Sequence, residues 1–271
     1  MRGEKKGMRG QPRITIITPS FNQAAFIERT IGSVLSQGYP DLEYIVVDGG
    51  STDGTTEILK RCEKGLRWVS EKDRGQTDAI NKGIRMATGD IIAYLNSDDV
   101  YEKDTLKKVA EYFTAHPEAR WATGRCRIID ANDREARGLI TAYKNFLLSR
   151  YSYNILLVTN FISQPATFLK KEVFEEFGLF DEKEHRVMDY EFWLRVGKKY
   201  PPGIIKDCLA SFRVHYESKT TSAFQKTFRE ELDVARKYSD SRLINALHYL
   251  SYIGICTVYT AINKPPRTRR G

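Results

Sequence analysis

Two adjacent carboxylates, Asp98 and Asp99, follow an apolar run in the segment "GDIIAYLNSDDV" (residues 89–100). Neighbouring carboxylates repel each other unless a cation or a hydrogen-bond donor neutralises them. Proteins bind Mg²⁺ and Mn²⁺ through one or two carboxylates together with phosphate oxygens of a substrate. The pair therefore indicates a divalent-metal site, although a solvated turn or a helix N-cap near Asp104 would also account for it.

A third carboxylate, Asp48, ends the apolar run "YIVV" (44–47) and begins the loop "GGSTDG" (49–54). Small loop residues let a ligand approach the backbone, and a carboxylate accepts hydrogen bonds from the N–H or O–H groups of a base or sugar. This loop therefore favours a nucleotide or sugar site. The structural alternative is that Asp48 and the loop only cap the following helix.

The elements that must position these residues alternate along the first half of the chain. We expect strands at 13–18, 42–47, 66–70 and 90–96, and helices within 24–38, 51–62, 77–89 and 104–117. This alternation predicts β-α-β units and an α/β fold with a mainly parallel sheet. Ligands of such sheets bind at the carboxyl ends of the strands, where five side chains would meet: Thr18, Asp48, Asp73, Asp98 and Asp99.

The pattern changes after residue 120. Residues 120–141 read as two strands around a polar turn near Asn132, and less regular sequence follows to about residue 163. We expect a helix in 188–200, a strand in 204–216 and a helix from Thr220 to Tyr238. No long Pro/Gly linker divides the body, so one domain with a C-terminal helical appendage is the predicted organisation.

Five segments in this order resemble the motifs of the family 2 glycosyltransferases: "ITIITPSFN", "YIVVDGGSTDGT", "SEKDRGQTDAINKG", "GDIIAYLNSDD" and "MDYEFWLRV". Members of this family are inverting enzymes of the GT-A fold that use nucleotide-diphospho-sugars. The resemblance covers about residues 13–217, and its "DRGQTDAINKG" form is similar to the bacterial branch that builds surface polysaccharides. The Q-x-x-R-W motif of processive cellulose- or chitin-type synthases is missing from the sequence.

The resemblance implies a division of the chain. A basic tail (1–12) would precede a GT-A domain (13–217) with a nucleotide-binding half (13–120) and an acceptor-binding half (121–217). C-terminal helices (218–263) and a second basic tail (264–271) would follow. The implied reaction is metal-dependent transfer of a sugar, from a UDP-sugar in the first instance, to a hydroxyl of a saccharide or lipid-linked acceptor.

The resemblance also implies roles for individual residues. Thr18, Pro19, Asp48 and Asp73 would line the nucleoside pocket, and Asp98 would face the ribose and the metal shell. Asp99 would be the direct ligand of Mn²⁺ or Mg²⁺, with Asp98 and His215 as further candidates; for His215 the alternative is a strand-end histidine without a ligand. Asp78 and Asn81 would lie near the diphosphate or donor sugar.

Asp189 matches the second residue of the family's Glu-Asp pair, the usual catalytic base. Because Met188 replaces the first residue of that pair, Glu191 is kept as a second candidate. The base would take the proton of the attacking acceptor hydroxyl, and a single displacement would invert the anomeric centre. Acceptor choice would depend on the irregular region 140–165, including Gln164.

The net charge of +8 lies at the two ends of the chain. Residues 1–13 and 264–271 each carry +4, so the body between them is formally neutral. A nucleic-acid binder would place the excess on the fold itself, so nucleic acid is not an expected partner. Basic ends suit an anionic membrane surface, or are simply solvated.

The segment "LINALHYLSYIGICTVYTAI" (243–262) is as long as a membrane span but diluted by polar residues. We expect an interfacial helix and peripheral membrane contact through 243–270; a helix packed on the protein itself or in an oligomer contact is the alternative. The four cysteines show no metal spacing and read as reduced thiols. Since no apolar leader follows the basic N-terminus, the expected location is the cytoplasm, on or near the inner face of the membrane.

Two other functions share parts of this pattern. A sugar-nucleotide pyrophosphorylase would share the sheet and the metal carboxylates, but it would need a Gly-rich, basic loop after the first strand, where "TPSFNQ" (18–23) stands. A non-catalytic membrane-surface module would explain the basic ends but not the carboxylates.

Overall fold

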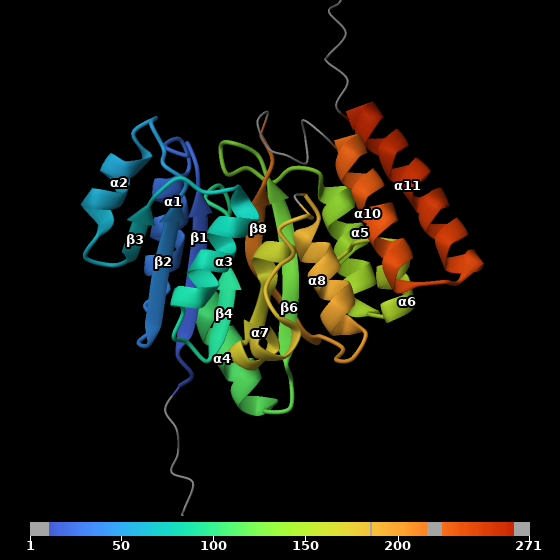
Figure 1. Cartoon of the computed structure of the whole chain (residues 1–271), viewed down its shortest axis with the longest axis horizontal. Coiled ribbons are helices and arrows are strands. Elements are labelled where there is room, and N and C mark those ends of the chain that lie inside the picture. The colour runs from blue at the N-terminus through green and yellow to red at the C-terminus, as the bar shows by residue number, and fades with distance from the viewer. Residues whose placement is uncertain (1–10, 185, 216–223, 263–271) are drawn as a thin grey trace, which may run out of the picture.

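The computed structural model describes residues 11–184, 186–215 and 224–262, which form an α/β fold around one sheet of eight strands. The strand order is β3-β2-β1-β4-β7-β6-β8-β5, and helices cover both faces (Figure 1). Four strand pairs are parallel and three are antiparallel, so the predicted mainly parallel sheet is confirmed. The strands are β1 (Ile14–Ser20), β2 (Leu42–Asp48), β3 (Arg67–Ser70), β4 (Ile91–Tyr94), β5 (Val100–Tyr101), β6 (Trp121–Ile129), β7 (Thr167–Lys170) and β8 (Gly203–Arg213).

The helices of the first half follow the expected alternation with the strands. The described helices are α1 (Ile27–Leu35), α2 (Thr55–Cys62), α3 (Gln76–Met86), α4 (Thr105–Ala115), α5 (Gly138–Ser149), α6 (Tyr153–Val158), α7 (Lys171–Phe177), α8 (Met188–Gly197), α10 (Phe224–Tyr238) and α11 (Arg242–Ile262). A short 3₁₀ turn, η1 (Gln164–Ala166), precedes β7. Helices α5, α6, α8, α10 and α11 of the second half gather on the right of the view in Figure 1.

Strand β4 shows why the central strands read as unbroken apolar runs. Ile91 and Ala93 belong to one core with α1, α2 and α4, whereas Ile92 and Tyr94 belong to a second core with α3, α7 and α8. Successive side chains of a strand point to opposite faces, and both faces are covered here. Every residue of β4 is therefore buried, and the strand leads directly into the Asp98–Asp99 pair.

The expected second strand after Asn132 is not formed. A single bridge joins Ile129 to Glu135, and the chain then turns into helix α5 at Gly138. The Asp130 carboxylate accepts hydrogen bonds from the backbone N–H of Asn132 (2.8 Å) and of Arg134 (3.0 Å), which closes the chain into a tight turn. This local capping leaves too few residues for a paired strand.

Helices α10 and α11 lie side by side next to α5 and α6 (Figure 1). The buried His248 ring contacts the Leu157 carbonyl through Nδ1 (2.7 Å), and the Phe228 and Tyr259 rings meet edge to face with centroids 5.1 Å apart. One face of α11 therefore packs on the protein itself. Across residues 11–184, 186–215 and 224–262, no helix combines the length and apolar composition of a membrane span.

Candidate active site

A cavity of about 1000 Å³ opens at the carboxyl ends of the strands and extends to helices α5, α10 and α11. Six of the predicted site residues line it: Pro19, Asp73, Asp98, Gln164, Asp189 and His215. Six others do not, and their side chains are buried among the elements that support it: Thr18, Asp48, Asp78, Asn81, Asp99 and Glu191.

Asp98 and His215 form a pair on the cavity wall. An Asp98 carboxylate oxygen lies 3.0 Å from Nε2 of His215, and the His215 ring packs on Phe26 with centroids 4.6 Å apart. Beneath the pair, the fully buried Arg213 donates from Nε to the Asp98 carbonyl (2.7 Å). The structure thus places His215, a candidate metal ligand from the sequence, beside Asp98. Arg213, which the sequence did not single out, holds the loop that presents Asp98.

Asp99 is fully buried, whereas Asp98 lines the cavity. The Asp99 carboxylate accepts hydrogen bonds from the backbone N–H of Arg213 (2.8 Å) and from Asn96 Nδ2 (3.2 Å). Burial, followed by the nearby Asp98 charge, raises the pKa of Asp99 well above its usual range. The expectation that Asp99 is the direct metal ligand does not fit this placement, because its oxygens face the core rather than the cavity.

Asp48 organises the glycine-rich loop from below. Its carboxylate accepts hydrogen bonds from the backbone N–H of Gly50 (3.1 Å) and Ser51 (2.9 Å) and from the hydroxyl of Ser70 (2.6 Å). Gly50 has φ 86, a left-handed conformation that favours glycine. The Asp48 carboxylate is fully buried and caps the loop itself rather than helix α2, whose N-cap residue is Gly54. Thr18 is similarly buried, with its hydroxyl 3.1 Å from that of Tyr44.

Two loops at this edge are joined by reciprocal hydrogen bonds. The backbone N–H of Asn22 donates to the Ser51 hydroxyl (2.8 Å), and the backbone N–H of Thr52 donates to Oδ1 of Asn22 (2.9 Å). The backbone N–H of Ala24 donates to Asp53 (2.9 Å). Residues 20–24 and 49–55 therefore form one unit, which explains much of the Gly-, Ser- and Thr-rich composition.

Asp73 depends on a glycine to reach the cavity. A Cβ built on Gly49 would lie 2.5 Å from Oδ2 of Asp73, closer than non-bonded atoms approach. Oδ1 of Asp73 accepts a hydrogen bond from the backbone N–H of Gly75 (2.9 Å). The absent side chain at Gly49 thus allows the carboxylate to lie over the loop.

Asp78 and Asn81 hold neighbouring loops rather than reaching the cavity. The Arg74 guanidinium donates to Asp78 (3.0 Å) and, as the largest cause, lowers the pKa of that carboxyl to about 2. Asn81 donates from Nδ2 to the Phe180 carbonyl (2.9 Å) and accepts from the Phe180 backbone N–H (3.1 Å). Both side chains are buried, and their expected contacts with diphosphate or donor sugar do not fit this arrangement.

Asp189 and Glu191 occupy opposite sides of the first turn of α8. Asp189 is half-buried on the cavity wall, whereas Glu191 is buried and pairs with Arg195 (2.6 Å) and with the Tyr238 hydroxyl. Residues two apart on a helix do not share a face. The structure therefore places only Asp189 where an acceptor hydroxyl could meet it.

A chain of amides crosses the floor of the cavity. Gln76 donates to Oδ1 of Asn96 (2.6 Å), and Gln164 donates to the Tyr94 carbonyl (2.6 Å) while its Oε1 lies 3.4 Å from Asn96 Nδ2. Gln164, predicted for the acceptor, thus lies beside the end of β4. Gln76 and Asn96 could not be predicted from the sequence, because amide pairs across distant segments leave no local pattern.

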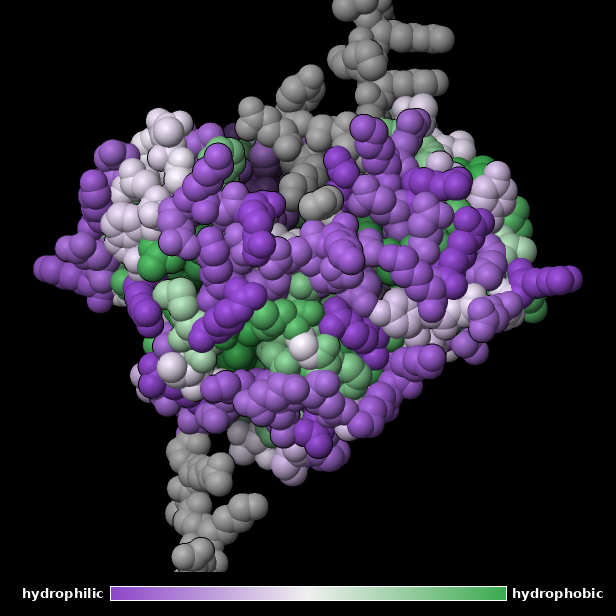
Figure 2. Space-filling view, viewed as in Figure 1, coloured by the Kyte–Doolittle hydropathy of each residue, from purple (hydrophilic) through white to green (hydrophobic). Residues whose placement is uncertain are grey.

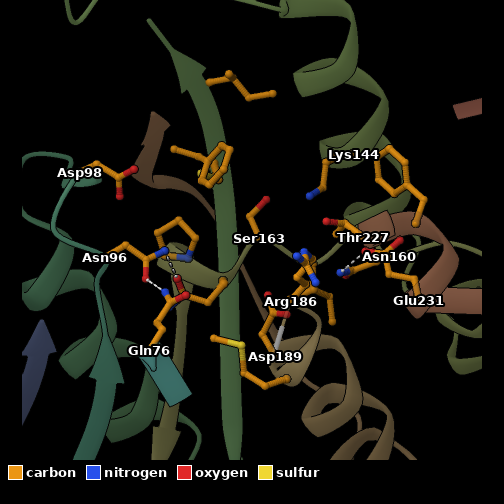
Figure 3. Close-up of a pocket in the computed structure, with 18 of the residues that line it drawn as sticks. Gln76, Asn96, Asp98, Lys144, Asn160, Ser163, Arg186, Asp189, Thr227 and Glu231 are labelled. Carbon is orange, nitrogen blue, oxygen red and sulfur yellow. Dashed lines mark hydrogen bonds between the residues drawn. The ribbon is translucent and has the colours of Figure 1, made fainter. Parts of the chain in front are cut away.

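A second polar cluster lies on the other side of the cavity from Asp98 and includes Lys144, Asn160, Thr227 and Glu231 (Figure 3). Asn160 donates from Nδ2 to Glu231 (3.1 Å). Burial, as the largest cause, raises the pKa of Glu231 to about 7, and the Asp189 charge adds to the shift. Asn160 falls in the irregular region expected to determine the acceptor, but Glu231 carried no signal, since a single acid on an amphipathic helix usually faces solvent.

The fit of a divalent metal rests on the Asp98–His215 pair. Within the described parts of the chain, no three His, Cys, Asp or Glu side chains gather closely enough to hold a metal by themselves. Two cavity-facing ligands nevertheless suit Mg²⁺ or Mn²⁺ that completes its shell with substrate phosphates and water.

A cavity lined by carboxylates at the carboxyl edge of a mainly parallel α/β sheet lies where such folds bind their ligands. The family described as "Glycosyl transferase family 2" matches residues 15–178. This match covers more than half of the chain, which therefore belongs to the family 2 glycosyltransferases and is a glycosyltransferase enzyme. Family membership decides against the pyrophosphorylase and the non-catalytic module.

Individual relatives agree with this assignment. The chain is 42% identical over 106 residues to a putative teichuronic acid biosynthesis glycosyltransferase, TuaG, of Bacillus subtilis; the match covers 38% of this chain and 42% of that protein, so the chain aligns with less than half of it. It is 30% identical over 210 residues, 76% of each chain, to an uncharacterized glycosyltransferase of Mycobacterium tuberculosis.

Two solved structures share the fold. The S. aureus TarS fragment 1–349 in complex with UDP-GlcNAc superposes with a TM-score of 0.65 at 17% identity and covers 89% of this chain and 71% of that chain. The mannosyltransferase PcManGT from Pyrobaculum calidifontis, in complex with GDP-Man and Mn²⁺, superposes with a TM-score of 0.67 at 20% identity and covers 95% and 77%. At these identities the likeness confirms the fold alone.

Proposed function

We propose that this enzyme transfers a sugar from a nucleotide-diphospho-sugar to a hydroxyl group of a saccharide or lipid-linked acceptor, with inversion at the anomeric carbon. One observation carries the proposal: a single cavity has the Asp98–His215 pair on one wall and Asp189 on another. A metal-bound leaving group and a base for the attacking hydroxyl are the two requirements of a single-displacement transfer.

The polar groups at the donor end of the cavity fit a nucleotide. The Ser20 hydroxyl and Oε1 of Gln23 are buried without a protein partner, and both residues line the cavity with Asp73. Buried polar groups without partners cost free energy, so a ligand that bonds to them is favoured. A UDP-sugar is the donor we propose, in line with the UDP-GlcNAc bound by TarS and the sugar nucleotide bound by PcManGT.

The proposed metal ligands are Asp98 and His215, with Mn²⁺ or Mg²⁺ as the ion. The bound ion would neutralise the charge that builds on the departing diphosphate. Arg213 holds the Asp98 loop through its hydrogen bond to the Asp98 carbonyl, and Phe26 packs against the His215 ring. These contacts orient both ligands before the donor arrives, which lowers the entropic cost of assembling the site.

Asp189 is the proposed base. Its carboxylate would accept the proton of the acceptor hydroxyl while the oxygen attacks the anomeric carbon from the face opposite the diphosphate. Asp73 and Pro19 are the proposed nucleoside contacts, and Gln164 the proposed acceptor contact, since each lines the cavity. For Thr18, Asp48, Asp78 and Asn81 the proposal is a supporting role through the loops that they hold.

Helix α11 gives the enzyme a surface for peripheral membrane attachment. Its outer face carries Leu243, Leu247, Leu250 and Ile253, each at least 44% exposed. Hydrophobic residues gather along the side of the molecule where α11 lies (Figure 2). An exposed apolar face on a helix fits burial at a membrane interface, and the acceptor class proposed above includes lipids. The basic segment 264–271, which lies outside the described residues, would add attraction to anionic lipid.

The test is turnover of UDP-GlcNAc and GDP-mannose with Mn²⁺, with Mg²⁺ and with EDTA, in the wild type and two matched variants. We expect metal-dependent turnover of the UDP-sugar. Asp98→Asn removes a cavity-facing ligand and should raise the Mn²⁺ concentration for half-maximal activity about tenfold or more. Asp99→Asn should lower the melting temperature but leave that concentration within about twofold, because the Asp99 side chain faces the core.

Two outcomes would contradict the proposal. Full turnover in EDTA would remove the metal from the mechanism. A Mn²⁺ requirement that rises in Asp99→Asn but not in Asp98→Asn would return the metal to the ligand that the sequence first suggested.

A further inference from the structure

The polar cluster opposite Asp98 has no role in the metal site or in the transfer of the proton to Asp189. Asn160 follows helix α6, and Glu231 comes from α10, outside the segment that the family matches. The cavity runs between this cluster and the Asp98–His215 pair, with Asp189 and Arg186 between the two sides (Figure 3). A ligand that contacts the cluster would therefore have Asp189 beside it.

Glu231 and Asn160 form a hydrogen-bonded pair whose carboxylate is buried, rather than a chance contact at the surface. The Glu231 side chain is 9% exposed, and its carboxylate accepts a hydrogen bond from Asn160 Nδ2 (3.1 Å). This contact fixes the orientation of the amide, since only its NH₂ group can face a carboxylate. Oδ1 of Asn160 is then left buried without a protein partner. Both are hydrogen-bond acceptors beside the cavity, and one of them is uncompensated.

The chemistry of the pair selects the kind of ligand. Two acceptors require a partner that brings hydrogen-bond donors. The charges here nearly cancel, since Lys144 lies beside Asp189 and Glu231, and Arg186 pairs with Glu230 (2.9 Å). The cluster therefore offers no excess positive charge to an anionic partner. A neutral polyol supplies several O–H donors without added charge.

We propose that Asn160 and Glu231 form the acceptor subsite, in which they accept hydrogen bonds from hydroxyl groups of a neutral pyranose and hold a neighbouring hydroxyl of that sugar against Asp189. The inference rests on the function proposed above and names the acceptor end of the same cavity. Glu231 is a specificity-determining residue in this scheme, and the proton of the reacting hydroxyl goes to Asp189.

The experiment compares the full chain with Glu231→Gln and Asp233→Asn. Glu231→Gln keeps the size of the side chain but replaces one acceptor oxygen with a donor. Asp233 lies on the same helix with its side chain 52% exposed and pairs with Arg229 and Arg236, so its variant is the matched control. The probes are methyl and octyl β-glycosides of glucose, galactose and N-acetylglucosamine. The octyl tail can pack on Phe228, Ile255 and Val258, which line the cavity on that side.

We expect Glu231→Gln to raise the KM for the best glycoside about tenfold, since a donor replaces one of the oxygens that would accept a hydrogen bond from the sugar. Donor hydrolysis without acceptor and the melting temperature should change little, and Asp233→Asn should match the wild type. An unchanged acceptor KM in Glu231→Gln would overturn the inference while leaving the transferase intact. Equal loss of donor hydrolysis and transfer would also overturn it, because Glu231 would then support the whole cavity.

Saturation-transfer NMR of the same glycosides, with UDP and Mn²⁺ present, provides a readout that does not need turnover. Binding of a glycoside to the wild type, with loss of the sugar-ring signals in Glu231→Gln, supports the subsite. Binding of none of the glycosides to the wild type, or equal signals in both proteins, overturns it. Absence of any turnover or donor hydrolysis in the wild type would instead count against the proposed function.

Discussion

The two ends of the cavity are built in different ways. The proposed donor end consists of loops that hydrogen bonds join to each other, as between Asn22 and Ser51, and that lie within the segment shared with the family. The proposed acceptor end consists of helix faces from α5, α10 and α11, of which α10 and α11 follow that segment. Among the described residues, all but one of the large exposed hydrophobic side chains lie on α5 or α11.

This difference matches what each end would bind: a donor with a constant core, and acceptors that vary. Any sugar nucleotide presents a diphosphate and a ribose, so the donor end benefits from loops with one geometry. Acceptors differ in shape and polarity, and helix surfaces can change residue by residue without loss of the backbone. The comparison predicts that substitutions at the two ends should affect different kinetic constants.

The largest expected effect is at the junction of the two ends. Asp189→Asn keeps the size of the side chain but cannot accept a proton, so turnover should fall about a hundredfold or more while donor binding stays nearly constant. The measurement is kcat at saturating donor and acceptor, with UDP affinity determined by calorimetry.

Glu191→Gln is the matched control for that experiment. It weakens the pairing with Arg195 and should lower the melting temperature, but turnover per folded molecule should be close to that of the wild type. If Glu191→Gln loses turnover and Asp189→Asn is mild, the base has been assigned to the wrong carboxylate.

A smaller effect is expected from a methyl group at the donor end. Gly49→Ala introduces a Cβ 2.5 Å from Oδ2 of Asp73 and must displace that carboxylate. The donor KM should rise about tenfold, with the acceptor KM unchanged, because only a donor contact moves.

Gly32 on α1 offers a control for the same chemical change, since a Cβ there would meet nothing within 4 Å. Gly32→Ala should stabilise the helix by about 0.5–1 kcal/mol and leave both KM values unaltered. A Gly49→Ala enzyme with an unchanged donor KM would remove Asp73 from the donor site.

The smallest expected effect concerns the outer face of the acceptor end. Leu250 is 63% exposed on α11, and Leu250→Glu should weaken binding to anionic liposomes about fivefold, as expected for a loss of about 1 kcal/mol of apolar burial. Ala115→Glu, an exposed position at the end of α4, makes the same charge change away from α11 and should have little effect. The measurement is co-sedimentation at low salt. If the full-length protein does not co-sediment with such liposomes, membrane attachment through α11 is wrong, and an oligomer contact is the alternative for its exposed face.

Sequence periodicity predicted the alternating first half of the fold, because its central strands are largely buried on both faces. β4 reads as a continuous apolar run, and β1 and β2 are mostly apolar, between amphipathic helices. Helix α5 was missed, since its opening residues "GLIT" carry β-branched side chains directly after a polar turn that resembles a hairpin.

The site was predictable as a location but not as a set of contacts. Of the five side chains expected to meet at the strand ends, only Asp73 and Asp98 line the cavity, where Asp189 and His215 join them. The sequence could not show which of Asp98 and Asp99 faces the cavity. Side chains of neighbouring residues after a strand point in different directions, and the contacts of Arg213 with both residues decide which carboxylate is buried. Glu231 could not be predicted as a site residue for a different reason. Its burial depends on how α10 packs against residues about seventy positions earlier in the chain.

The reliance of the acceptor wall on two helices that follow the shared segment bears on how such enzymes diversify. A genetic exchange downstream of residue 215 would replace α10 and α11 together and leave the joined loops of residues 20–24 and 49–55 untouched. Chimaeras made at that boundary would keep α5 and Asn160 from one parent and take Glu231 from the other, so a changed acceptor range in them would trace to α10 and α11.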